Sequence, residues 1–193
     1  MSTSEKLVAS AAGELRERGV FAASLEAVRR RAGVSTGSTY HHFPGGMPAV
    51  SAEVYRSTLE EYQRSAAAHL AAATDAEQGV KDGVTHLLSW VEADPARARL
   101  LYQLENAIDP AILDGTAQPL TDAIDTWLAR FGKPDAIEHR AELLALWIGA
   151  AKEYGRLWTR NQSLAPPAAV AEQLADAAWV SMQPFVRMPR RAR

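Results

Sequence analysis

A chain of 193 residues with a formal net charge of −2 can bury a substantial core, either as one domain or as a small module joined to a larger one. It contains no cysteine, which excludes disulfides, thiolate zinc sites and cysteine nucleophiles. It lacks a signal-peptide pattern and any run of ~18 uncharged apolar residues, so we expect a cytoplasmic protein without a membrane partner.

The sequence predicts an all-α fold. Alanine is abundant and apolar residues recur at helical spacings, whereas alternating β-branched runs are nearly absent. The first helix is expected over residues 4–18, and Gly19 ends it. Phe21 should then fill the core behind this helix. The buried face of the helix is predicted to contain Leu7, Val8, Ala11, Ala12 and Leu15.

Two short helices joined by a tight turn come next. Ser24 is placed to cap a helix that ends at Gly33, and Ser35 to cap a third helix over about residues 36–42. Gly33 permits a sharp turn and Val34 should pack beneath it. This is the pattern of a helix-turn-helix.

The rest of the chain predicts a larger helical region. A long helix should begin near Gly45, with Pro48 tolerated in its first turn, and connect this region to the first three helices. Proline-containing breakers separate the helices that follow. Those helices are expected near 75–93, 95–107, 117–131, 136–160 and 167–183.

The segment from Ala32 to Phe43 closely resembles the signature of the TetR family. It has an Ala-Gly-Val-Ser turn followed by a short helix that ends in a Tyr-x-His-Phe element. About the first 55 residues take part, and chance agreement over such a span is far less common than for a lone short motif. Further matches to the small, turn and core residues of the family's N-terminal domain are Ala11, Ala12, Gly19, Phe21, Ser24, Leu25 and Val28.

The resemblance implies a one-component transcriptional repressor rather than an enzyme. Such a protein binds palindromic operator DNA as a homodimer, is released by a small-molecule effector and needs no cofactor. We accordingly expect a three-helix helix-turn-helix domain at residues 1–46, joined by a long helix to a helical ligand-binding and dimerisation domain at 47–186. A basic, disordered tail is expected at 187–193.

The third helix has side chains suited to reading DNA. Thr36 and Ser38 supply two hydroxyls around Gly37, which has no side chain, so the backbone can approach base edges in the major groove. Hydroxyl, imidazole and free backbone N–H groups at helix starts can donate to phosphates. The predicted DNA-binding residues are Ser24, Ser35, Thr36, Gly37, Ser38, Tyr40, His41, His42 and Gly46.

Charge supports nucleic-acid binding only weakly. Residues 1–50 carry six Lys/Arg against four Asp/Glu. Met47 stands where the family usually has a lysine that faces a phosphate, a loss that should flatten the salt dependence of DNA binding by about one unit. We interpret the run 29–31, three arginines, mainly as a solvated helix face, with phosphate contact as the alternative.

The aromatic residues of the larger domain predict a pocket for an aromatic or lipophilic effector. The alternative is that most of them fill the core, and that the one acidic candidate faces water. The predicted ligand-binding residues are Trp90, Leu101, Tyr102, Glu105, Trp127, Trp147, Tyr154 and Trp158.

The last two helices have apolar faces that predict a four-helix dimer interface. In residues 141–158 apolar or small side chains recur at alternating spacings of four and three, and the final helix has one apolar side. The alternative is that both helices fill the core of a single chain.

Two other functions remain open. An enzyme is disfavoured because no Glu-x-x-His pair or Gly-rich phosphate loop occurs, and the neighbouring His41 and His42 point about 100° apart, which disfavours a metal site. The second is a TetR-like ligand-binding module with weak or no specific DNA binding, which Met47 favours.

Overall fold

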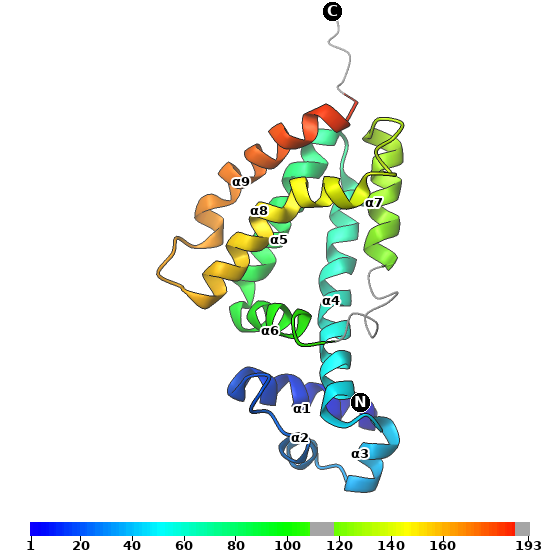
Figure 1. Ribbon diagram of the computed structural model, residues 1–193, viewed down its shortest axis with the longest axis vertical. Coiled ribbons are helices and arrows are strands. Elements are labelled where there is room, and N and C mark those ends of the chain that lie inside the picture. The colour runs from blue at the N-terminus through cyan, green and yellow to red at the C-terminus, as the bar shows by residue number, and fades with distance from the viewer. Residues whose placement is uncertain (109–117, 188–193) are drawn as a thin grey trace, which may run out of the picture. The chain divides into compact units, whose positions relative to one another are not determined.

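The computed structural model describes residues 1–108 and 118–187, and in these residues the fold is all-α, as predicted. The only β-type pairing there is a single isolated bridge between Gly132 and Val186. Among these residues, no helix is both long enough and apolar enough to span a bilayer. The helices are α1 (Thr3–Arg18), α2 (Leu25–Ala32), α3 (Thr36–His42), α4 (Gly46–Ala72), α5 (Ala76–Ala93), α6 (Pro95–Glu105), α7 (Gln118–Phe131), α8 (Arg140–Arg160), α9 (Pro167–Met182) and a 3-10 turn (Gln183–Phe185) (Figure 1).

The chain divides into two compact units. The N-terminal unit contains residues 1–61 and the described part of 96–116, and the C-terminal unit contains 62–95 and the described part of 117–193. Helix α4 therefore contributes to both. The predicted boundary after residue 46 stays a prediction, and the expected disorder of the tail concerns residues that, apart from Arg187, lie outside the described ones.

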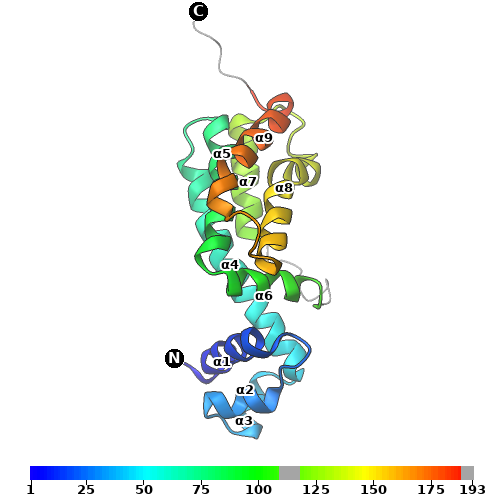
Figure 2. The ribbon, with the colours of Figure 1, turned by 90° about the vertical axis from the view of Figure 1, so that its left-hand side faces the viewer.

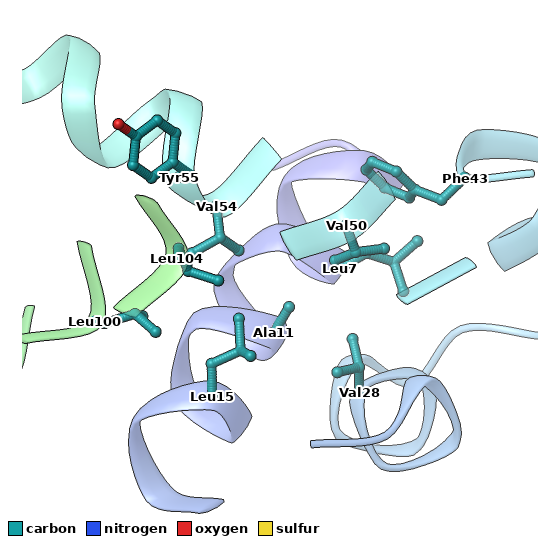
Figure 3. Close-up of a cluster of buried hydrophobic side chains, with 10 residues drawn as sticks. All are labelled: Leu7, Ala11, Leu15, Val28, Phe43, Val50, Val54, Tyr55, Leu100 and Leu104. Carbon is teal, nitrogen blue, oxygen red and sulfur yellow. The ribbon is translucent and has the colours of Figure 1, made fainter. Parts of the chain in front are cut away.

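The core of the N-terminal unit joins α1, α2, α4 and α6 (Figure 3). Leu7 and Val50 are fully buried at its centre, where the side chains of α1 meet those of α4. Leu100 and Leu104 of α6 complete the cluster, although they lie far along the chain. The whole cluster consists of Leu7, Ala11, Leu15, Val28, Phe43, Val50, Val54, Tyr55, Leu100 and Leu104.

The prediction that Phe21 fills this core is wrong. Its side chain is 100% exposed, and the preceding Val20 packs against the cluster instead. Gly19 ends α1 with a φ of 81° while its N–H donates to the carbonyl of Leu15 at 2.9 Å. The chain leaves the helix in a direction that turns Val20 inward and the next side chain outward.

In the C-terminal unit, α5, α8 and α9 pack against one another (Figure 1, Figure 2). The indoles of Trp127 and Trp147 lie 4.9 Å apart between ring centroids, against α5. Glycines make room for them: a Cβ on Gly79 would lie 2.2 Å from Trp127 Nε1, and one on Gly83 would lie 3.0 Å from Trp147 Cζ2. Helix α8 begins at Arg140 and not near 136, because residues 134–139 form turns.

Candidate DNA-binding surface

The helix-turn-helix is built by local caps. The Ser24 hydroxyl oxygen accepts from the N–H of Ala27 at 3.3 Å, and Ser35 accepts from Ser38 at 3.2 Å. Gly33 ends α2 in the left-handed region with a φ of 66°. A serine hydroxyl that accepts in a cap still has a hydrogen to donate, so capping and phosphate contact are compatible.

One face of α3 is anchored and the other is exposed. Thr39 is fully buried, and its hydroxyl donates to the carbonyl of Ser35 at 2.9 Å. The side chain of Tyr40 is 53% exposed. Of the other predicted DNA-binding residues on α3, Ser38 is half-buried and those at the surface are Thr36, Gly37, His41 and His42.

No contact or backbone angle within the described part of the chain explains why residue 37 is a glycine. A Cβ at this position would meet nothing within 4 Å, and the positive φ angles of the described residues are at other glycines. A glycine within a helix costs about 0.5–1 kcal/mol relative to alanine. No contact among the described residues therefore requires a glycine at this position, and the α3 backbone is open to the outside here.

The start of α4 differs from what the sequence predicted. The N–H of Gly46 donates to the carbonyl of Phe43 at 2.9 Å, so this donor is engaged and not free for a phosphate. Met47 is partly buried and packs against the core of the N-terminal unit. A phosphate contact at this helix start would need the amides that follow.

The arginines of α1 and α2 that lie near the helix-turn-helix form ion pairs with acids of the same unit. Surface ion pairs of this kind are worth little for stability, but they reduce the positive field that a phosphate would meet. The pairs are Arg18 with Glu14 at 3.1 Å, Arg31 with Glu17 at 2.8 Å, and Glu26 with Arg29 at 2.6 Å and with Arg30 at 3.7 Å.

The predicted ligand-binding residues are divided between the two units. In the N-terminal unit, Leu101 packs against the core, Tyr102 is buried and Glu105 is exposed. In the C-terminal unit, the Tyr154 hydroxyl donates to the carbonyl of Ala165 at 2.7 Å. The buried tryptophans of that unit are Trp90, Trp127, Trp147, Trp158 and Trp179.

The C-terminal unit contains a hollow of about 340 Å³ that the sequence did not predict. It lies between the end of α4 and α7, and Trp127 alone belongs to the predicted set. The spacing of Trp127, Arg130 and Phe131 on one helix was the available signal. Its lining residues are Leu70, Ala71, Asp122, Ala123, Thr126, Trp127, Arg130 and Phe131.

A polar cluster joins α4 and α5 in the same unit. The hydroxyl of Ser65 lies 2.9 Å from His86 Nε2, and the rings of His86 and His69 lie 4.4 Å apart between centroids. Burial, followed by the charge of His69, lowers the pKa of His86. Burial raises the pKa of the nearby Tyr62 to about 12. The cluster therefore favours uncharged side chains.

Residues 7–45 match the model of the bacterial regulatory proteins of the tetR family. One relative is the HTH-type transcriptional activator FasR of Mycolicibacterium smegmatis, 24% identical over 171 residues, which cover 84% of this chain and 75% of that protein. The chain thus has the N-terminal domain of the tetR family, and the resemblance inferred from the sequence is confirmed.

Two solved structures have the same overall fold. The fatty acid degradation regulator FadR of Bacillus halodurans is 16% identical, with a TM-score of 0.70 and coverage of 91% of this chain and 97% of that one. FadR of Bacillus subtilis, in complex with stearoyl-CoA, is 12% identical, with a TM-score of 0.71 and coverage of 92% and 98%. At these identities the shared property is the fold.

Proposed function

We propose that this chain is a transcriptional regulator whose α3 binds operator DNA in the major groove. The observation that carries the proposal is the empty space beside Gly37, flanked by the exposed Thr36 and the half-buried Ser38. Close approach of a partner to the helix backbone is what major-groove recognition requires. Thr39, locked in the core, holds the helix in place behind this surface.

The direct test is binding to a fluorescent duplex that carries the DNA upstream of the protein's own gene, at several salt concentrations. We expect salt-sensitive binding that Thr36→Ala, Ser38→Ala and Tyr40→Ala each weaken. Wild-type binding that is weak on many sequences and indifferent to these substitutions would support the alternative, a DNA-silent ligand-binding module. The partly buried Met47 and the internally paired arginines favour that alternative.

We also propose a homodimer that forms through α8 and α9. Leu146 and Leu157 of α8 are 45% and 42% exposed, and Val180 of α9 is 64% exposed. Gly149 lies on α8 between the two leucines, and a Cβ there would meet nothing within 4 Å. A symmetric partner that packs closely against this face would account for both the apolar side chains and the glycine. Palindromic operators follow from such two-fold symmetry.

For the effector we propose a long-chain acyl thioester that binds in the C-terminal unit. The support is the stearoyl-CoA complex of Bacillus subtilis FadR, together with a hollow whose lining includes the aromatic Trp127 and Phe131 and the basic Arg130. Effector and operator should weaken each other's binding by the same factor. Whether the bound protein represses, as we expect, or activates depends on where its operator lies.

The effector is tested with stearoyl-CoA and with coenzyme A alone. Stearoyl-CoA should raise the melting temperature and release the duplex, whereas coenzyme A should do neither. Ala123→Trp, which would fill the hollow, should abolish both effects, and Ala129→Trp on the exposed side of α7 serves as the control. A response to highly polar metabolites only would contradict a lipophilic effector.

A further inference from the structure

The side chain of Arg29 links α2 to the turn that precedes α3. Its Nε and Nη2 atoms donate to the two carboxylate oxygens of Glu26 at 2.9 and 2.6 Å. Its Nη1 donates to the carbonyl of Val34 at 3.1 Å. The N–H of Val34 in turn donates to the backbone carbonyl of Arg29 at 3.1 Å. Arg29 therefore holds both polar groups of Val34.

Val34 occupies the position where the direction of α3 is set. Gly33 turns the chain in the left-handed region, and Ser35 is already the N-cap of α3. The peptide group that joins Val34 to Ser35 is planar, so fixing its carbonyl restricts the rotation on both sides of it. A hydrogen bond to this carbonyl consequently restrains the orientation of the whole recognition helix.

This arrangement needs an arginine. A guanidinium is planar and presents five N–H donors in a fixed fork, which allows a bidentate bond to a carboxylate together with a bond to a carbonyl. The single ammonium of lysine has neither the reach nor the geometry for both partners. The hydrogen bond from Arg29 also holds the pKa of Glu26 below its ordinary value, which favours the charged carboxylate that this pair requires.

We infer that Arg29, held by Glu26, is a positioning residue that fixes the turn between α2 and α3 and so presents one orientation of the recognition helix to DNA. The inference rests on the proposed DNA-binding function. Three of the arginine's donors are committed inside the chain, so Arg29 does not act as a free phosphate contact. An exposed ion pair adds little stability. Its effect should therefore appear in specificity more than in the melting temperature.

The first test compares Arg29→Ala and Arg29→Lys with Arg30→Ala. Arg30 is the matched control, because it is adjacent, its side chain is 70% exposed and it lies 3.7 Å from Glu26. For both Arg29 variants, affinity for the operator should fall by about 10-fold, while affinity for random-sequence DNA and the salt dependence stay as in the wild type. The Arg30 variant should keep the wild-type ratio of specific to non-specific affinity.

Two results would overturn the inference. One is an unchanged ratio of specific to non-specific affinity in Arg29→Ala. The other is an equal loss on both DNAs with a salt dependence about one unit smaller, which would identify a direct phosphate contact.

A second measurement needs no DNA. In the free protein, hydrogen–deuterium exchange of the amides in residues 34–43 should be faster in both Arg29 variants and unchanged in Arg30→Ala. Exchange in α5, which belongs to the C-terminal unit, provides the internal reference. If the wild-type protein binds no operator, the proposed function fails, yet exchange still tests the restraint on the turn. Exchange that is unaffected by Arg29→Ala would reject the restraint even if DNA binds.

Discussion

The glycines of α3 and α5 have opposite surroundings. A Cβ on Gly37 would enter empty space, whereas one on Gly79 or Gly83 would enter the indoles of Trp127 and Trp147. Only on α3 would an alanine have room to add its helix-stabilising effect. On α5 the chain fills the gap with its own side chains, and on α3 the gap is left open.

The surroundings of a helical glycine distinguish a position used for packing within the chain from one that is open to a partner. A glycine whose space is filled contributes to the packing of its own unit, while a helical glycine with open space and an ordinary φ leaves room for a partner to approach the backbone. Gly149 on α8 belongs with Gly37 in the second group. Substitution at these positions should consequently affect different properties of the protein.

The largest effect is expected from Gly149→Arg. In a two-fold dimer the added side chain would clash twice, once from each copy. We expect the dissociation constant of the dimer to rise by about 100-fold or more in sedimentation equilibrium, with the helical content unchanged. Gly37→Arg, at the other open glycine, is the control and should leave the dimer intact. If the Gly149 variant dimerises as tightly as the wild type, this face of α8 is not the interface.

A substitution at a glycine whose space is already occupied by a neighbouring side chain should instead affect folding. Gly79→Ala places a methyl group 2.2 Å from Trp127 Nε1, inside a closely packed core. Such overpacking should lower the free energy of unfolding by about 3 kcal/mol in urea denaturation. Gly83→Ala, with its nearest contact at 3.0 Å, should cost less. Equal stability of the Gly79 variant and the wild type would show that the indole moves freely.

Gly37→Ala should separate stability from binding. Because its Cβ meets nothing, the free energy of unfolding should rise by about 0.5–1 kcal/mol in thermal denaturation. Affinity for the operator should fall at the same time, because the added methyl lies where DNA approaches. An increase in stability without any loss of affinity would place the DNA elsewhere.

The stability of the C-terminal unit should also depend on pH through a partly buried histidine. His86 is partly buried in the C-terminal unit and its pKa is lowered, so the unfolded chain takes up this proton first as the pH falls. Its contribution to stability is complete above about pH 6.5, the ordinary histidine value, and is lost as the pH falls through the lowered pKa. Urea titrations at several pH values should show this loss, and His86→Gln should reduce it.

The helix-turn-helix was predictable because its signals are local. Ser24, Gly33 and Ser35 act on residues within a few positions, and all three behave as the sequence indicated. Phe21 was misplaced because the direction in which the chain leaves Gly19 decides whether residue 20 or 21 faces inward. That direction depends on the backbone angles at Gly19, for which the sequence gives no direct signal.

The effector region was much less predictable. A buried tryptophan in a core and one in a pocket have the same helical spacing, and only the neighbours from other helices distinguish them. Trp147 donates to the carbonyl of Val80, a partner distant in sequence. The sequence likewise gave no signal that Leu101, on α6, packs against the core of the N-terminal unit.

The place of α6 in the N-terminal core has a consequence for the order of folding. Leu100 and Leu104 share one buried cluster with Leu7, so this unit depends on contacts of long sequence separation (Figure 3). During synthesis the ribosome must release α6 before the cluster can close. Until then Leu15 of α1 and Val54 of α4 lack the apolar neighbours that Leu100 and Leu104 supply. A nascent chain stalled after α4 would accordingly be a target for chaperones and proteases.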